Sequence, residues 1–166
     1  LYYKRQFSEL GGEKMESYEI NKDTLALIAL KDKTEVFEEN DHFFVDKVAN
    51  EIMEASCEYF GSSLAGRQKG TENLIGSTYK APVIVEESQE IIFFPTESPR
   101  REECSWISLQ KINKYFRMGD KIVVEFKNGS RVVLNISYGK LDNQVMRATR
   151  LESVLRGRKY DKNSFK

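Results

Sequence analysis

The sequence contains few of the residues from which catalytic and metal sites are usually built. Its 166 residues include one histidine, His42, and two cysteines, Cys57 and Cys104. These three residues lie far apart along the chain and lack the spacing of a zinc site. Two cysteines are too few for a disulfide framework, and both are explained most simply as packed core thiols. We therefore expect no enzyme, no metal and no cofactor.

Long apolar runs are also missing. No stretch approaches the ~20 consecutive apolar residues of a membrane span. The first residues lack a secretory pattern, because Tyr3-Lys4-Arg5 is followed by polar residues. Hydrophobic residues still make up 40% of the chain, which is enough for the core of one domain. We expect a cytoplasmic protein that makes no membrane contact.

The net charge is zero, yet the charges are unevenly distributed. Residues 1–60 hold 7 Lys/Arg and 14 Asp/Glu, whereas residues 61–166 hold 19 and 12. From Trp106 onward the counts are 14 and 5. Such asymmetry indicates a polyanion partner. The other interpretation is that the acidic and basic halves pair within one fold or between subunits, and the two interpretations are compatible.

Apolar periodicity predicts one α+β domain with short antiparallel strands, hairpins and about three helices. Asn128-Gly129 between two β-rich runs predicts a hairpin with a type I′ turn. The expected helices cover residues 46–60, a short segment that ends at Gly76, an ambiguous segment at 109–117, and 140–156. The expected strands cover residues 17–20, 24–30, 42–45, 83–85, 91–94, 104–108, 122–126 and 131–134, the first two of them forming a hairpin.

The central segment, residues 56–72, combines glycines, hydroxyls and two cations. Ser62 or Ser63 is suited to cap a following helix. Gly66 permits close backbone approach. A helix start attracts anions such as phosphate, and Arg67 and Lys69 add positive charge there. The segment therefore either holds a nucleic-acid backbone or simply reverses the chain, with both cations in solvent.

Further basic and amide side chains follow in the second half of the chain, and contacts from Lys and Arg to phosphate would provide affinity for nucleic acid. On the last predicted helix they lie on a different side from the apolar stripe, although a solvated face would have the same pattern. No helix-turn-helix, zinc finger or RNP motif is present. These candidate DNA-binding residues are Arg100, Arg101, Lys111, Lys114, Arg117, Asn143, Arg147 and Arg150.

The chain resembles the ComK family of competence transcription factors over about residues 16–152. The most specific match is the segment Phe60-Gly61-Ser62-Ser63 with Ala65-Gly66-Arg67. The other matching segments are Glu16-Ser17-Tyr18-Glu19, Gly70-Thr71, Phe93-Phe94-Pro95-Thr96, Cys104 with Trp106-Ile107-Ser108, Asn128-Gly129, and Ile136-Ser137-Tyr138 with Asn143-Gln144-Val145.

This resemblance implies a sequence-specific DNA-binding activator of DNA-uptake genes. Family members bind paired A/T-rich boxes, mainly through the minor groove, as homodimers or dimers of dimers. Such a protein is cytoplasmic and nucleoid-associated, and a MecA-type adaptor delivers it to a Clp protease. The resemblance also favours a contact between Arg67 and DNA.

Two parts of the chain depart from the family pattern. We expect a polar arm at 1–15, the ComK-like domain at 16–156 and a basic tail at 157–166. The arm has no counterpart in the family, and the longer family tail with its adaptor-recognition segment is missing. This puts adaptor-mediated turnover in doubt more than DNA binding. The alternative hypothesis is a diverged or truncated relative that acts as a protein–protein interaction module without activation.

Overall fold

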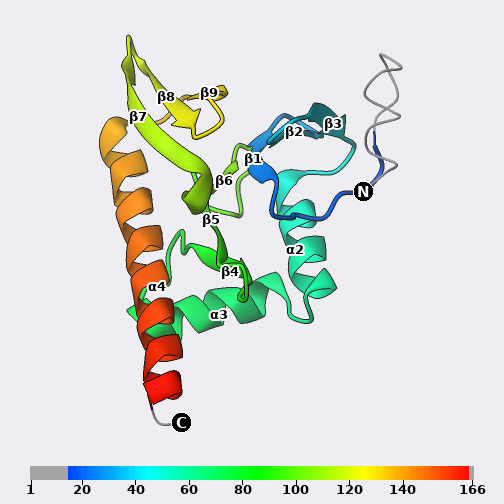
Figure 1. The fold of residues 1–166 in the computed structure, drawn as a ribbon. Coiled ribbons are helices and arrows are strands. Elements are labelled where there is room, and N and C mark those ends of the chain that lie inside the picture. Colours follow the sequence, from blue (N-terminus) through cyan, green and yellow to red (C-terminus); the bar gives the residue numbers. More distant parts are fainter. Residues whose placement is uncertain (1–14, 165–166) are drawn as a thin grey trace.

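A six-stranded antiparallel sheet forms the centre of the protein. The computed structural model describes residues 15–164 (Figure 1). The strand order is β3-β2-β1-β6-β5-β4, so β1 in the first half of the chain pairs with β6. The strands are β1 Thr24–Ala29, β2 Thr34–Glu38, β3 His42–Val45, β4 Val83–Glu86, β5 Ile91–Pro95 and β6 Trp106–Ser108.

Both faces of this sheet are apolar, so each face needs a cover. Along β5, Ile91 and Phe93 point into one hydrophobic cluster, and Ile92 and Phe94 point into another. This follows from the period of two residues in a strand. The first face is covered by α2, Ala49–Tyr59, which inserts Ile52 and Met53.

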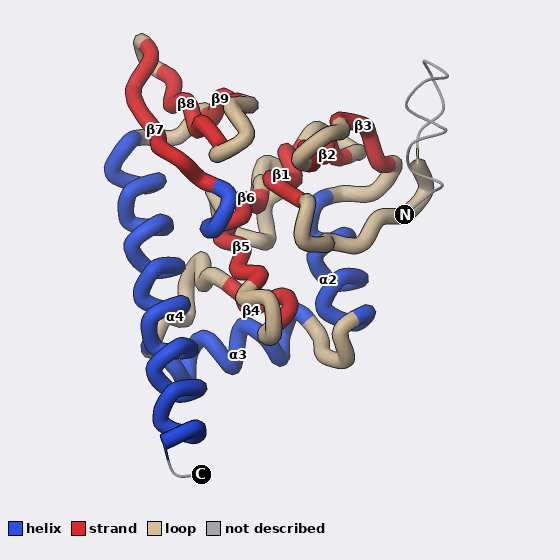
Figure 2. The backbone as a smooth tube through the Cα atoms, in the orientation of Figure 1, coloured by secondary structure: helices blue, strands red, loops and turns tan. Residues whose placement is uncertain are grey.

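The second face is covered by a smaller sheet and a long helix. The smaller sheet has the order β7-β8-β9, with β7 Ile112–Met118, β8 Lys121–Phe126 and β9 Arg131–Leu134. Helix α4, Tyr138–Ser164, lies along one side of the molecule (Figures 1 and 2). Four residues of its predicted apolar stripe are buried in this second cluster: Leu141, Ala148, Leu151 and Leu155.

Helix α3, Leu64–Ile75, crosses below the sheet between α2 and α4 (Figure 1). Its start and end are those expected from local chemistry. The Ser63 hydroxyl accepts a hydrogen bond of 2.9 Å from the Gly66 N–H, as a helix cap does. Gly76 ends the helix in the left-handed conformation, with φ of 73°.

The α+β fold and the three helices are confirmed, but several local predictions are wrong. The expected strand at 17–20 is not one; Tyr18 and Ile20 are buried there without strand pairing. Strand β1 therefore forms its hairpin with β2. The charged segment 31–41 predicts a loop with a frayed strand around Val36-Phe37, and the structure has the regular strand β2 there. Helix α4 extends beyond the predicted end at 156 and continues through Gly157 to Ser164. Residues 1–14 of the predicted arm lie outside the described residues.

Residues 109–117 form a 3₁₀ turn, Leu109–Lys111, followed by β7, and not the predicted α-helix. The spacing of Leu109, Ile112 and Tyr115 fits a helical period. However, pairing with β8 determines the conformation of this segment, as tertiary context commonly overrides local propensity.

The hairpin between β8 and β9 is confirmed, but its turn is not type I′. Gly129 has φ of 88°, whereas Asn128 is not among the residues with positive φ. The Gly129 N–H donates to the Phe126 carbonyl, and the Phe126 N–H donates to Ser130. This is a type I turn closed by a glycine bulge. The Asn128 side chain stabilises it by accepting from the Ser130 N–H at 3.0 Å.

None of the helices in the described part of the chain is long and apolar enough to span a bilayer.

The two-sided burial of β5 leads to a stability prediction. Phe94 is 0% exposed, and Phe94→Ala should lower the free energy of unfolding by about 3–5 kcal/mol, because it leaves a cavity in the second cluster. Urea titration followed by circular dichroism would measure this change. The control is Met146→Ala on α4, where the side chain is 62% exposed and a change within ~0.5 kcal/mol is expected. A loss below ~1 kcal/mol for Phe94→Ala would contradict the described core.

Candidate nucleic-acid interface

One side of α4 carries a row of polar and basic side chains that is separate from its buried stripe. Asn143, Met146, Arg147 and Arg150 follow one another at helical spacing, so they share a face. Asn143, Met146 and Arg150 are exposed, and Arg147 is half-buried. We call these four residues the α4 row.

Arg147 connects the α4 row to the segment before β4. Its guanidinium Nη1 donates to the Tyr79 carbonyl at 3.0 Å and to the Gln144 side chain at 3.1 Å. Gln144 in turn donates to the Lys80 carbonyl at 2.8 Å. Lys80 has φ of 50°, so α4 holds this segment in a conformation that only a minority of residues adopt. The Tyr79 ring remains 63% exposed beside Arg147.

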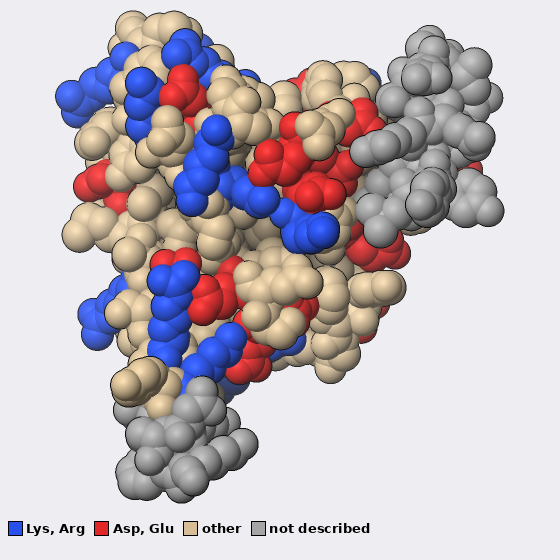
Figure 3. Space-filling view, in the orientation of Figure 1, with Lys and Arg blue, Asp and Glu red and all other residues tan. Residues whose placement is uncertain are grey.

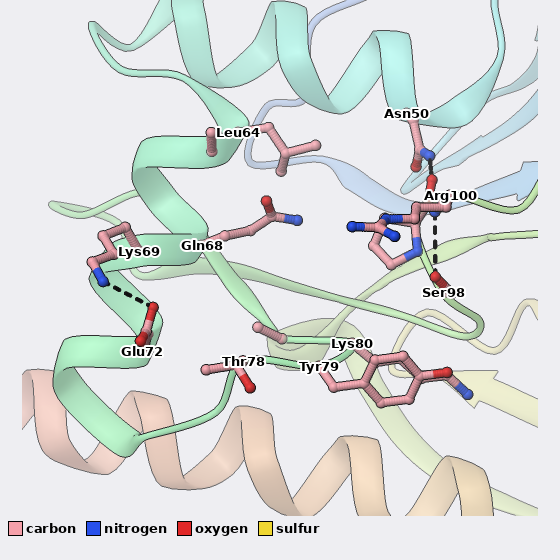
Figure 4. Close-up of a pocket in the computed structure, with 13 residues that line it drawn as sticks. Asn50, Leu64, Gln68, Lys69, Glu72, Thr78, Tyr79, Lys80, Ser98 and Arg100 are labelled. Atoms are coloured by element: carbon pink, nitrogen blue, oxygen red, sulfur yellow. Dashed lines mark hydrogen bonds and ion pairs between the residues drawn. The ribbon is translucent and has the colours of Figure 1, made fainter.

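A cavity of about 610 Å³ opens on the other side of Tyr79 (Figure 4). Lys69 of α3, Lys80 and Arg100 contribute its cations. Lys69 pairs with Glu72 at 3.2 Å and Lys80 with Glu97 at 3.8 Å, whereas no ion pair involving Arg100 is found among the described residues. The cavity thus brings together basic groups from α3 and from the segments that precede β4 and β6.

The 98–100 loop is anchored to the core below this cavity. The Trp106 indole N–H donates to the Asn50 side-chain oxygen at 2.9 Å, and the Asn50 amide donates to the Pro99 carbonyl. Trp106 is completely buried. The position of Arg100 is therefore set by the packing of β6 against α2. Arg101 follows in the same loop and is exposed.

Arg67 and Lys69 lie on different sides of α3. Residues two apart on a helix do not face each other. Arg67 lines a second cavity, together with Ser62, Gly66 and two basic residues of α4, Arg158 and Lys159. Gly66 is required by the cap, because a Cβ there would lie 3.1 Å from both the Ser62 and Ser63 hydroxyls. The predicted central segment is thus the capped start of α3, and its two cations, Arg67 and Lys69, point to different sides of that helix.

The remaining predicted cations lie on or beside the smaller sheet. Lys111 forms an ion pair of 2.8 Å with Glu39, so its charge is largely matched within the fold. Lys114 is exposed, 3.8 Å from Glu125. Arg117 lies over the ring of Tyr138, at 4.9 Å, where β7 meets the start of α4.

The surface shows the charge asymmetry of the sequence. On the face drawn in Figure 3, Lys and Arg gather over the end of the β7–β8 hairpin, whereas Asp and Glu gather over β1–β3. The two halves do pair locally, through Lys111 and Glu39. The fold nevertheless leaves the basic residues of the hairpin and of α4 facing solvent.

Comparisons with known proteins show the family of the chain. A family model described as ComK protein matches residues 15–160. A competence transcription factor of Bacillus subtilis (strain 168) is 35% identical over 149 residues, which is 87% of this chain and 78% of that protein. This chain belongs to the ComK family. It is accordingly a transcriptional regulator of the ComK type. No solved structure matches it significantly.

Sequence reasoning missed several residues of the candidate interface. Tyr79 and Lys80 precede Ala81-Pro82 in a segment without periodicity, and only the contact with Arg147 shows their place. Arg158 and Lys159 were assigned to a tail, although they belong to α4 and line the Arg67 cavity. Met146 follows apolar Val145 in the sequence; its helical spacing from Asn143 and Arg150 is the signal that could have found it.

The three residues considered for catalysis lie apart in this ComK-family protein. His42 pairs with Glu35 at 3.0 Å and stacks on Phe37. Cys57 is buried in α2 and Cys104 near β6. Burial raises the pKa of the Cys57 thiol to about 11 and that of Cys104 to about 12. Within the described residues, no group of three His, Cys, Asp or Glu side chains is placed to hold a metal ion.

The raised thiol pKa values lead to a prediction about reactivity. At pH 8 both cysteines should be protonated in the folded protein, and only the thiolate attacks a maleimide. We expect labelling at least ~100-fold slower than that of free cysteine, whose pKa is about 8.5. The rate should approach that of free cysteine in 8 M urea. Rapid labelling of the native protein, located by mass spectrometry, would show that the labelled cysteine is accessible.

Proposed function

We propose that this protein is a sequence-specific DNA-binding activator of competence genes, which binds paired A/T-rich boxes mainly through the minor groove. Membership of the ComK family supports the regulatory role. The observation that carries DNA binding is the α4 row, which lies beside the cavity that contains Lys69 and Arg100 and is joined to it by the contact between Arg147 and Tyr79.

This arrangement has the chemistry that duplex recognition requires. Exposed Lys and Arg side chains bind phosphates and release counterions. Arg side chains are favoured in the narrow minor groove of A/T-rich DNA, where the negative potential is enhanced. Asn143 has a donor and an acceptor for base edges. We assign Lys69, Arg100 and Arg150 to phosphate contacts and Asn143 to base contact; Arg147 holds Tyr79 in place between them.

The β7–β8 hairpin is a second element suited to a DNA groove. The undistorted minor groove is ~6 Å wide and too narrow for a whole α-helix, so contacts there would involve side chains or a thinner element. The hairpin end carries exposed Lys114, Arg117 and Met118. It lies against the start of α4, where Tyr115 donates to Asp142 at 2.5 Å. Lys111 and Arg101 are weaker candidates for contact with DNA.

Paired boxes favour two-fold symmetry in the bound protein, so we propose a homodimer or a dimer of dimers. The acidic end around β1–β3 is the candidate subunit contact, because it is separate from the basic end of the hairpin on the face drawn in Figure 3. Location at the nucleoid in the cytoplasm, and turnover by a MecA-type adaptor and a Clp protease, are proposed on the family resemblance alone.

Binding to a duplex with two A/T boxes and to one with both boxes scrambled tests this function. We expect a preference of ~1,000-fold for the boxed duplex. Arg150→Ala should weaken binding to both duplexes and reduce the salt slope by about one. Asn143→Ala should cost about 1–3 kcal/mol on the boxed duplex only. Fluorescence anisotropy at two salt concentrations would measure all of these quantities.

The control is Lys47→Ala, which removes one positive charge at the entrance of α2, where Lys47 lies 3.9 Å from Glu51. It should leave box preference and salt slope unchanged. Equal and weak binding of the wild type to both duplexes would refute sequence-specific activation and favour the alternative, a protein–protein interaction module. If Asn143→Ala keeps the preference for the boxed duplex, the assignment of Asn143 on α4 to base contact is wrong.

A further inference from the structure

The cavity around Arg67 has features of a ligand site and is separate from the residues assigned to DNA above. It has a volume of about 360 Å³ and lies between α3 and the second half of α4. Its charged lining consists of Arg67, Arg158 and Lys159 against a single carboxylate, Glu87. Lys159 also donates to the Glu87 carbonyl at 2.7 Å, which fixes its position at the rim. The cavity is therefore cationic.

Arg67 has an unused donor inside the protein. Its Nε atom is buried, and no hydrogen-bond acceptor for it is present among the described residues. Buried polar groups are nearly always hydrogen-bonded, and an exception calls for an explanation. The guanidinium fork binds phosphate and carboxylate groups bidentately. The Arg67 side chain also lines the cavity, and its terminal guanidinium nitrogens are the donors that an anionic oxygen there would meet.

Gly70 leaves open space on the cavity side of α3. It lies in the interior of α3 and lines the same cavity. Glycine destabilises a helix interior relative to alanine, yet Gly70 is not among the glycines with positive φ. A Cβ placed on it would meet nothing within 4 Å. The absent side chain therefore leaves room for a ligand against this side of α3.

The inner wall of the cavity is apolar, and this indicates the class of ligand. Leu74, Ile84 and Leu155 contribute it, and Ile84 and Leu155 belong to the second hydrophobic cluster. A bare phosphate ion would leave this wall uncovered. A phosphate ester with an organic part of nucleotide size would place its phosphate on the three cations and its remainder on the aliphatic side chains.

We propose that this cavity is a binding site for a small phosphate ester, with the Arg67 guanidinium as its principal phosphate ligand and Arg158 and Lys159 at the rim. The same phosphate chemistry is present in the DNA backbone, so the test must separate a free ester from a duplex. The proposed site does not depend on the proposed DNA function, because AMP and phosphate are first titrated in the absence of DNA.

The experiment titrates the full chain with AMP and with inorganic phosphate by calorimetry at constant ionic strength. We expect AMP to bind at one site and at least tenfold more tightly than phosphate. Arg67→Lys keeps the charge but loses the guanidinium fork, and it should weaken AMP binding at least tenfold. Gly70→Leu should abolish binding by filling the cavity, while the circular dichroism spectrum stays that of the wild type.

Two matched variants control for the effects of adding a leucine side chain to a helix and of removing a positive charge elsewhere. Gly157→Leu adds the same side chain on α4, where a Cβ also meets nothing within 4 Å. Lys69→Gln removes a cation from the other side of α3. Both should bind AMP as the wild type does. Absence of saturable AMP binding below 10 mM in the wild type, or unchanged affinity in both Arg67→Lys and Gly70→Leu, would overturn the proposal.

A competition arm identifies the source of the phosphate. If AMP binds and the boxed duplex does not displace it, the natural ligand is a free ester. If the duplex displaces AMP and Gly70→Leu weakens duplex binding at least tenfold, the site serves the DNA backbone and the assignment to a free ester is wrong. A wild type that binds AMP but has no box preference would refute the DNA function and leave this site intact.

Discussion

The structure depends on the burial of one sheet on both of its faces. Strands β5 and β6 alternate between two hydrophobic clusters, so neither face can be left to solvent. One helix suffices for the first face, whereas the second needs both the smaller sheet and α4. The surfaces proposed to bind ligands arise from this second cover. The α4 row lies on a helix whose other side packs against the sheet, and Leu155 of that packed side contributes to the wall of the Arg67 cavity.

The same constraint explains why charge separates across the molecule. Acidic residues of the first half lie around β1–β3, and basic residues of the second half lie on β7–β8 and α4. They meet where Lys111 reaches Glu39. A zero net charge therefore coexists with a local positive potential. For a nucleic-acid partner, the local distribution decides where contact occurs, because exposed charges beyond about a Debye length are screened.

Signals from neighbouring residues predicted the features of the fold that depend on neighbouring residues, such as helix caps and turns. The Ser63 cap, the Gly76 terminus, the α4 stripe and the position of the β8–β9 hairpin all follow from nearest neighbours. Long-range contacts were not predictable in this way. Residues 109–117 fit a helical period until β8 pairs with them, and Arg67 and Lys69 were grouped although a helix places them about 200° apart. Membership of the ComK family was recognisable from the sequence, whereas the partition of its basic residues into separate surfaces was not.

Helix α4 follows every strand in the chain, and this order has a consequence for synthesis. A ribosome releases residues in sequence, so the six-stranded sheet emerges while its second apolar face has no helix to cover it. Apolar strands exposed in this interval are targets for chaperones and proteases. Because the α4 row is on the same helix, the nascent chain cannot present this proposed DNA surface before the helix that covers the sheet has been made.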